Sequence, residues 1–389
     1  MNTQELAAFA ASKETPFYLY ELGTIGRQFQ ILREALPKTC NIYYSMKANP
    51  HKEVVMELVR LGANIDISSH QEMLRTISWG VHPSKLSLVG PGKTEALLLG
   101  AVQAQIGVIV VESHSEMLRL DRIAQAEGRR MSVKLRINPK LWIDQAGRAR
   151  KSQSSQFGID ETQLSATIDR LLNLNSLEWI GIHCHVQSSF LSAEYLLNNF
   201  RSVISMGKEL ADRYPGKIQG ITIGGGLGIA MFSDQENLKI SELSKGLHEL
   251  LPKMDLNYSI ESGRFLVGAA GHFVSRIIEV KESYGKNIII IDGGMSNHMA
   301  AAGFGSLLRK NFLISLLPSQ IVKTAAGTER RTYSIAGPSC YSMDVLGSDI
   351  ELPIAEEGDF ICIHNSGAYG LTFSPNEFLG LPKAKEYFL

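Results

Sequence analysis

Three short segments of the sequence bring together residue types that bind and activate small molecules. Lys47 ends the strand-like run 40–47 (CNIYYSMK), where desolvation and neighbouring cations would lower the pKa of its amine and favour Schiff-base formation. Gly224–Gly228 (GGGLG) leaves backbone N–H groups unobstructed, as a phosphate-binding loop requires. Glu261 and Arg264 in ESGR offer a carboxylate for a protonated ring nitrogen and a guanidinium for phosphate oxygens.

An amine, a phosphate loop and a carboxylate together predict a pyridoxal phosphate site. This cofactor needs an amine for its aldehyde, hydrogen-bond donors for its phosphate and an acid near its pyridine nitrogen. His185 adds a flat imidazole that can stack on a ring. Taken singly, the features also fit a solvated lysine, a tight turn, a surface ion pair and a core histidine, and we interpret His183 in this last way. Their combination favours the cofactor site.

The elements that must position these residues form a repeated pattern of strand and helix. Eight apolar, β-branched runs alternate with amphipathic segments, several of which close on a glycine: 40–47, 63–69, 85–91, 106–113, 129–138, 179–186, 219–226 and 256–263. Eight such units predict a (β/α)8 TIM barrel, whose active site lies at the C-terminal ends of the strands. Those ends are polar or glycine-rich and carry, in order, Lys47, Ser69, the Gly90–Gly92 turn, Glu112, Asn138, His185, Gly224–Gly226 and Glu261.

A second domain is expected after Gly271, where strand-like runs follow one another with few helical stretches. These runs are 272–282, 286–294, 331–339 and 359–367. The early run 16–21 (PFYLYE) has no place in an eight-stranded barrel, so we assign it to the same domain. The sequence therefore predicts an α/β protein with a barrel over 23–271 and an all-β domain built from 1–22 plus 272–389.

The composition argues for a small-molecule enzyme. The 389 residues include 39 basic and 39 acidic side chains, with no basic excess for nucleic acid or an anionic membrane. The first residues lack a signal-peptide pattern and no apolar run reaches the length of a membrane span, so a soluble, cytoplasmic protein is expected. Four cysteines without CxxC spacing predict neither a zinc site nor a disulfide framework.

Six ordered motifs extend this prediction over almost the whole chain: YYSMKANP, HCHVQSS, GGGLGI, ESGRFLVGAAG, GPSCYSMDVLG and GAYG. Together they resemble the fold-type III pyridoxal-phosphate decarboxylases, a family that includes diaminopimelate, ornithine and arginine-type decarboxylases. The resemblance implies an alanine-racemase-like barrel, a C-terminal β domain and a homodimer whose active sites lie at the subunit interface.

The resemblance also implies a role for individual residues. Lys47 matches the Schiff-base lysine, His185 the stacked imidazole and Glu261 the partner of the pyridine nitrogen. Cys340 matches the cysteine given across the dimer interface, which would return a proton to the α-carbon. The residues that match phosphate contacts are Ser188, Gly224, Gly225, Gly226, Arg264 and Tyr369.

The residue after Cys340 separates this chain from its better-known relatives. Diaminopimelate decarboxylases have Glu there and ornithine decarboxylases Asp, each meeting a distal ammonium, whereas this chain has Tyr341. The arginine-rich segment that holds the distal carboxylate of diaminopimelate is replaced by 297–312 (NHMAAAGFGSLLRKNF). We expect Tyr341 and Asp344 to contact an amino acid carried on a citryl group or a carrier protein, as in siderophore or antibiotic synthesis. A diaminopimelate decarboxylase and an amino-acid racemase are the alternatives; a non-catalytic cofactor carrier would lack the second domain.

Overall fold

The computed structural model describes residues 1–251, 256–304, 310–319 and 329–389, and within them the chain divides into two compact units. The barrel unit holds Gly26–Ile229 and Asn237–Leu266; the β unit holds Met1–Ile25, Ala230–Glu236 and Val267–Leu389. No pattern in the sequence predicts that residues 230–236 belong to the β unit. Of the segment 297–312, residues 305–309 lie outside the described residues.

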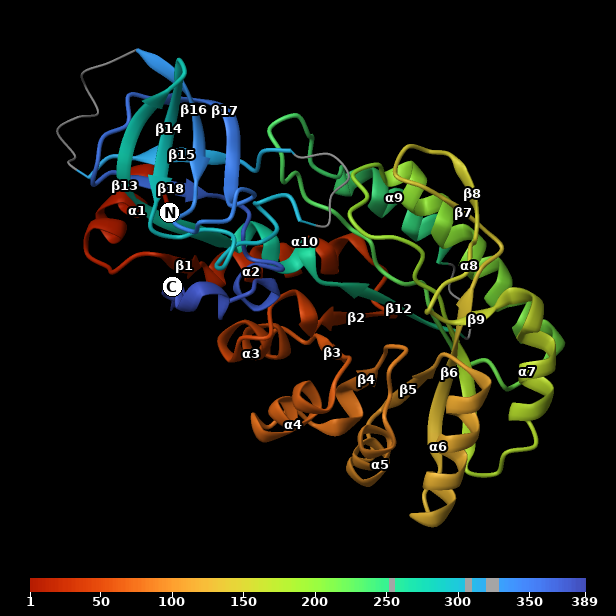
Figure 1. Cartoon of the computed structure of the whole chain (residues 1–389). Helices are drawn as coiled ribbons and strands as arrows, with labels where there is room; N and C mark the ends of the chain where they lie inside the picture. Colours follow the sequence, from red (N-terminus) through yellow and green to blue (C-terminus); the bar gives the residue numbers. More distant parts are fainter. Residues whose placement is uncertain (252–255, 305–309, 320–328) are drawn as a thin grey trace. The chain divides into compact units, whose positions relative to one another are not determined.

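The barrel unit is a closed ring of eight parallel strands, which confirms the predicted fold (Figure 1). The ring closes because β12 pairs with β2 and β10 pairs with both β6 and β11. In chain order the strands are β2 (Cys40–Ser45), β3 (Asn64–Ile67), β4 (Leu86–Leu88), β5 (Val108–Val111), β6 (Met131–Asn138), β10 (Leu177–His183), β11 (Gly220–Thr222) and β12 (Asn257–Ser262).

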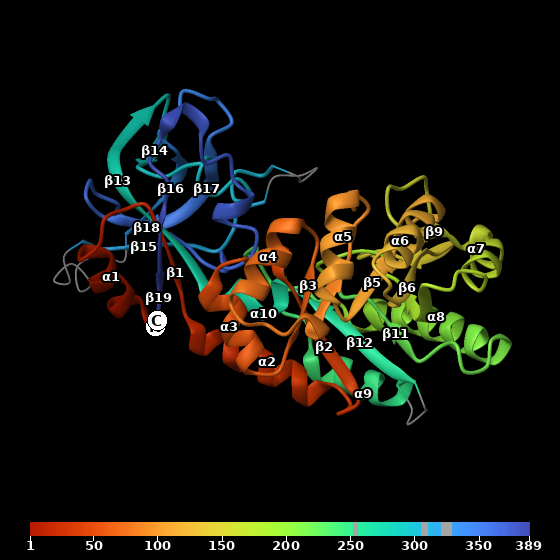
Figure 2. The ribbon, with the colours of Figure 1, turned by 90° about the horizontal axis from the view of Figure 1, so that it is seen from below.

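Helices alternate with these strands, as Figure 2 shows for the run from β2 to β6. They are α2 (Leu22–Ala35), α3 (Lys52–Arg60), α4 (His70–Ser78), α5 (Glu95–Ala104), α6 (His114–Ala126), α7 (Leu164–Leu171), α8 (Ala193–Arg213), α9 (Ile240–Leu250) and α10 (Arg264–Val267). The predicted closing glycines follow α3, α4 and α6 with positive φ at Gly62, Gly80 and Gly128, a conformation that costs glycine little. Among the described residues, no helix is both long and apolar enough to cross a membrane.

Three short elements lie near the C-terminal ends of the barrel strands. The 3-10 turn η1 (Met46–Ala48) follows β2, and the two-residue strand β9 (Ile159–Asp160) extends the sheet beside β6. Between β6 and β9, β7 (Leu141–Ile143) and β8 (Ala149–Lys151) form an antiparallel hairpin. The sequence pattern did not predict this hairpin, because its strands are short and mostly exposed.

The β unit is mostly sheet. Its described strands are β1 (Phe17–Tyr20), β13 (Gly271–Ser283), β14 (Lys286–Ile291), β15 (Ile314–Leu317), β16 (Arg330–Ala336), β17 (Val345–Pro353), β18 (Phe360–Ile363) and β19 (Lys385–Phe388). β1 pairs with β13, so the segment that carries β1 belongs to this unit. Helix α1 (Thr3–Ala11) is an addition to a domain predicted as all-β; it buries Leu6, Ala7 and Ala10 against the sheet.

Candidate active site

Lys47 lies in the turn η1, two residues after Ser45, the last residue of β2. It is exposed, so the desolvation expected for a strand-terminal lysine is not found. The reason is the turn, which carries the side chain beyond the last strand residue, Ser45. The ammonium still acts on the buried site: it opposes the rise in the pKa of Asp66 that burial causes, and it adds to the burial that lowers the pKa of His185.

His185 is held by hydrogen bonds on both ring nitrogens. The Gly225 N–H donates to Nδ1 at 3.2 Å, and Nε2 lies 3.2 Å from the Ser188 Oγ. Because a backbone N–H needs a lone pair as acceptor, Nδ1 is unprotonated and the proton sits on Nε2. Burial lowers the pKa of His185 to about 4, with Lys47 and Arg136 acting in the same direction. The ring is therefore neutral and fixed in orientation at physiological pH.

Glu261 and Asp66 are two buried acids with opposite protonation preferences. Burial alone would raise the pKa of Glu261, but the His183 charge and its 2.8 Å contact outweigh burial and lower it to about 2. Burial raises the pKa of Asp66 well above its ordinary value, and Glu261 raises it further. Glu261 therefore keeps its charge while Asp66 favours its proton.

Lys134 on β6 is a third buried ionisable residue of this site. Its ammonium donates to the Thr222 Oγ1 at 2.8 Å. Burial lowers the pKa of Lys134 to about 8, and Glu261 acts against that shift. The buried Lys134 ammonium thus interacts electrostatically with the Glu261 carboxylate.

The glycine turn after β11 has no room for side chains. A Cβ at Gly224 would lie 2.3 Å from the Cys184 carbonyl oxygen, and one at Gly225 would lie 2.1 Å from the Glu261 carbonyl oxygen. Gly224 and Gly226 also have φ values of 78° and 103°, in the region that favours glycine. Arg264 begins α10 directly after β12 and is half-buried.

Two other predicted strand-end residues have structural roles. Ser69 caps α4 by accepting the Glu72 N–H. Glu112 accepts a hydrogen bond from buried Arg136 at 2.8 Å and another from the Gly90 N–H at 2.7 Å. These contacts tie neighbouring strands together at the end of the barrel that carries Lys47.

Asn138, the last residue of β6, lies beside a cavity at the same end of the barrel. Its amide donates to the Asp160 carboxylate at 3.0 Å. It lines a cavity of about 540 Å³, together with residues of the β7–β8 hairpin and of the following turn: Lys140, Leu141, Lys151, Ser152, Gln153, Ser154, Asp160, Glu161 and Thr162. A smaller hollow of about 70 Å³ beside it is lined by Asn138 and His185.

In the β unit, the predicted residues cluster on one loop and one turn. Cys340 and Tyr341 are exposed, whereas Cys40, Cys184 and Cys362 are buried, as expected of packing cysteines. Tyr369 is half-buried, with φ at 55°.

Asp344 is placed differently from the substrate contact that we expected. It is 3% exposed, and its carboxylate oxygens accept the backbone N–H groups of Met295 and Ser339 at 2.7 and 3.1 Å. Each carboxylate oxygen thus accepts a main-chain N–H group, and the two groups come from different segments of the chain. Asp344 is therefore a positioning residue for the loop that carries Cys340 and Tyr341.

The residues at the barrel mouth fit pyridoxal phosphate. Within the described part of the chain, Asp66 Oδ1, Gln187 Oε1 and Ser262 Oγ are buried and find no hydrogen-bond partner. Such atoms normally require a partner, and they lie on β3, after β10 and on β12, around the glycine turn. The site offers the groups that the cofactor requires: the Lys47 amine, the neutral His185 ring, the ionised Glu261 carboxylate and the backbone of the glycine turn.

Comparison with known proteins decides the family. Residues 22–268 match the family described as "Pyridoxal-dependent decarboxylase, pyridoxal binding domain". The chain belongs to the pyridoxal-dependent decarboxylases. It is accordingly a carboxy-lyase with pyridoxal phosphate as cofactor, and the racemase alternative is not supported.

Similarity to individual decarboxylases extends over both units. The chain is 30% identical to the L-glutamyl-[BtrI acyl-carrier protein] decarboxylase of Niallia circulans over 98% of this chain and 90% of that protein. It is 31% identical to the diaminopimelate decarboxylase of Vibrio cholerae over 95% of this chain and 87% of that protein. The crystal structure of Helicobacter pylori diaminopimelate decarboxylase with L-lysine superposes with a TM-score of 0.87 at 26% identity, covering 100% of this chain and 94% of that one.

The sequence missed the residues that set the charge of this decarboxylase site. His183 is a buried core histidine, as the sequence predicts, but its hydrogen bond to Glu261 was not foreseen. Asp66 was not singled out, although a carboxyl group inside the apolar run NIDI is a signal that could have found it. The same holds for Lys134 in MSVKLRIN.

Proposed function

We propose that this decarboxylase removes the α-carboxylate of an amino acid that is carried on a larger group, either a carrier protein or a citryl moiety. Tyr341 is the observation that carries the proposal. It is 44% exposed and stands directly after Cys340, where the resemblance expects an acid that meets a distal ammonium. A phenol pairs instead with a neutral or anionic tail. The similarity to a decarboxylase whose name gives a carrier-linked glutamyl substrate supports this interpretation.

In this proposal, the barrel residues bind the cofactor. Pyridoxal phosphate, when bound, supplies an aldehyde that links to amines and a ring that accepts the electron pair left by the departing carboxylate. Lys47 provides the amine for that link, and His185 provides a neutral ring face. The phosphate contacts are Ser188, Gly224, Gly225, Gly226, Arg264 and Tyr369.

Glu261 sets the reaction type. Its pKa of about 2 keeps it ionised, because His183 outweighs the effect of burial. An ionised carboxylate holds a proton on the ring nitrogen of the cofactor, which strengthens electron withdrawal from the α-carbon. Loss of CO2 demands that withdrawal, whereas a racemase is better served by less of it.

Cys340 completes the site from a second copy of the chain. The thiol is exposed in the described structure, as a group offered to a partner must be. We propose a homodimer in which Cys340 of one protomer returns a proton to the α-carbon of the substrate bound by its partner. Tyr341, next in sequence, would then contact the substrate tail at the same interface.

A diaminopimelate decarboxylase is the second candidate, since the Vibrio cholerae enzyme of that name is 31% identical to this chain. Kinetics with the purified holoenzyme separate the two. CO2 release is measured from L-glutamate linked to a carrier protein, from citryl-linked diamino acids and from free lysine, ornithine and diaminopimelate. The proposal expects the highest kcat/KM for a conjugated substrate. If diaminopimelate has the highest kcat/KM, the proposal and the role of Tyr341 are both wrong.

A further inference from the structure

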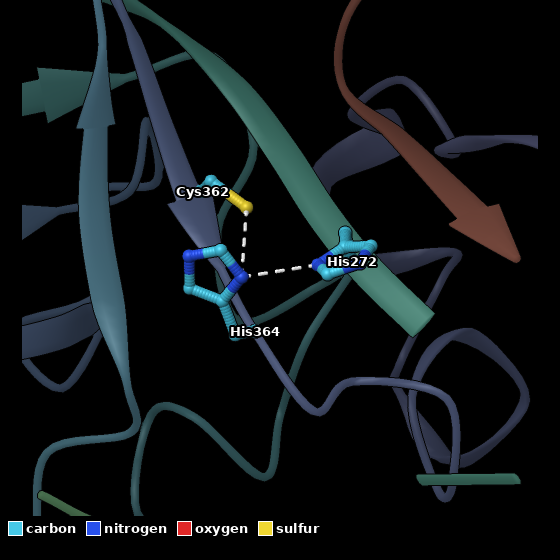
Figure 3. A group of neighbouring side chains, drawn as sticks. All are labelled: His272, Cys362 and His364. Carbon is cyan, nitrogen blue, oxygen red and sulfur yellow. Dashed lines mark hydrogen bonds between the residues drawn. The ribbon is translucent and has the colours of Figure 1, made fainter. Parts of the chain in front are cut away.

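Away from the barrel, the β unit brings two histidines and a cysteine together on one face of its sheet. His272 lies on β13, Cys362 on β18 and His364 just after β18 (Figure 3). The two strands are antiparallel, with Val274 opposite Cys362. Because side chains alternate along a strand, positions 362 and 364 share a face, and so do 272 and 274. Three ligand-type side chains therefore meet at one point.

The donor atoms lie at the spacing of a coordination shell. His272 Nδ1 and His364 Nδ1 are 3.1 Å apart, and Cys362 Sγ is 3.7 Å from His364 Nδ1. All three atoms lie within 4.8 Å of one another. In a tetrahedral zinc site, with Zn–N of about 2.0–2.1 Å and Zn–S of about 2.3 Å, two nitrogens lie about 3.3 Å apart and a nitrogen and a sulfur about 3.6 Å apart.

The opposite nitrogens of both histidines are already occupied. His272 Nε2 lies 3.3 Å from the Glu21 Oε1, and His364 Nε2 lies 2.7 Å from the Ser315 Oγ. An ionised carboxylate only accepts hydrogen bonds, so His272 carries its proton on Nε2 and presents a lone pair at Nδ1. Burial raises the pKa of Glu21, but the nearby N-terminal ammonium and His272 outweigh it and leave the pKa lowered. A carboxylate behind a histidine is the arrangement that orients metal-binding imidazoles.

We propose that the β unit binds one zinc-like divalent cation through His272 Nδ1, His364 Nδ1 and Cys362 Sγ, with water as the fourth ligand. The ion joins β13 to β18. Binding releases one proton, because Cys362 must become a thiolate. The thiolate offsets one of the two positive charges of the ion, and Glu21, which is paired with the N-terminal ammonium, orients His272.

A metal-free arrangement is the competing explanation of the same contacts. Ser315 would donate to His364 Nε2, and His364 Nδ1–H would donate to His272 Nδ1. That chain of hydrogen bonds ends at Glu21 and leaves Cys362 as a thiol. It predicts no zinc affinity at this place.

Zinc titration of the full-length holoenzyme distinguishes the two arrangements. After treatment with a chelator, the protein is titrated with Zn²⁺ against a chromogenic competitor. We expect one ion per chain. Cys362→Ser and His364→Gln should weaken binding at least about hundredfold, and Glu21→Gln about tenfold. Cys184→Ser, which changes a buried cysteine of the barrel, is the matched control and should leave the affinity unchanged.

X-ray absorption spectroscopy of the zinc-loaded wild-type enzyme gives a test that needs no variant. The proposal expects one sulfur and two imidazole ligands around the ion. A shell of oxygen and nitrogen alone, or equal zinc affinity in wild type and Cys362→Ser, would overturn it. Neither readout depends on the substrate of the decarboxylase, so the outcome is separate from that of the proposed function.

Discussion

In the barrel, His185 accepts a hydrogen bond at Nδ1 from the Gly225 N–H, whereas in the β unit the Nδ1 atoms of His272 and His364 approach each other to 3.1 Å. Both ring nitrogens of His185 have hydrogen-bond partners, so the flat face of its imidazole is the part that can stack on another ring. The second arrangement gives each Nε2 atom its own partner and, in our proposal, leaves the two Nδ1 lone pairs for an ion. The contact made by one nitrogen thus decides what the rest of the ring can do.

The acids beside the two histidine clusters differ in the same way. Glu261 is buried with His183 at 2.8 Å and serves the ring nitrogen of a cofactor in our proposal. Glu21 stands behind His272 and orients it. We therefore expect chemistry to be lost by changes in the barrel, while changes in the β unit affect ion binding or the completion of a partner's site.

The largest effect is expected for Lys47→Ala. Without the amine that links to the cofactor, CO2 release should fall by at least about 10⁴-fold. Borohydride treatment of the wild-type enzyme followed by peptide mapping should place the pyridoxyl group on Lys47. Lys52→Ala, at the exposed start of α3, is the control and should keep full activity. A pyridoxyl group on a different lysine would contradict the assignment.

Mixing two inactive variants tests whether the regions cooperate between subunits. Lys47→Ala and Cys340→Ala proteins, exchanged in equal amounts, should recover about a quarter of wild-type activity, because half the dimers are hybrids and each hybrid holds one intact site. Activity is measured by CO2 release after exchange.

The matched mixture is Lys47→Ala with Glu261→Gln. Lys47 and Glu261 both lie in the barrel unit, so in a hybrid dimer neither site holds both native residues, and recovery is not expected. The shared-site proposal would be wrong if the two mixtures recovered equal activity. It would also be wrong if neither mixture recovered activity although subunit exchange had been demonstrated.

Some of these residues and elements could be predicted from the sequence, and others could not. The eight barrel strands were predictable because apolar runs and polar ends repeat in register with helical segments. The contacts around Glu261 were not, because β3, β10 and β12 come together only through their pairing with β2 and β11 in the closed ring, which spacing along the chain does not reveal. The cluster of His272, Cys362 and His364 was hidden for a related reason. Val274 and Cys362 are far apart in the sequence, and only the pairing of β13 with β18 makes them neighbours.

A smaller loss is expected for Glu261→Gln. An amide cannot hold the proton on the cofactor nitrogen as a carboxylate does, so kcat should fall about hundredfold. The pH profile is a second readout, since the wild-type carboxylate stays charged down to its pKa of about 2. Unchanged kcat would show that Glu261 acts only as the partner of His183.

Asp66→Asn is expected to stabilise the protein at neutral pH. The pKa of Asp66 is raised by burial and by Glu261 from an ordinary 3.8, so the unfolded chain gives up this proton at lower pH than the folded one. The stability that Asp66 contributes is present below pH 3.8 and lost as pH rises through the folded pKa.

Asparagine avoids that loss, and we expect the free energy of unfolding at pH 7 to rise by about 1–2 kcal/mol. Urea unfolding at pH 7 and pH 4 measures it, and the advantage should shrink at the lower pH. Asp169→Asn, at an exposed position, serves as the control. A variant less stable than wild type at pH 7 would mean that Asp66 is ionised and paired in the fold.

The remaining expected effect concerns the tail of the substrate. Tyr341 is exposed, and Asp344 holds its loop through the Ser339 N–H, so Tyr341→Glu should change the side chain without releasing the loop. A carboxylate beside a distal ammonium adds a charge-assisted hydrogen bond worth about 1.5–3 kcal/mol. Since 1.4 kcal/mol corresponds to about tenfold, kcat/KM for free lysine or diaminopimelate should rise at least about tenfold relative to a carrier-linked substrate. Tyr284→Glu, fully exposed in the β13–β14 turn, controls for added charge. If the ratio of the two kcat/KM values stays constant, Tyr341 does not contact the tail, and the preference for conjugated substrates must arise elsewhere.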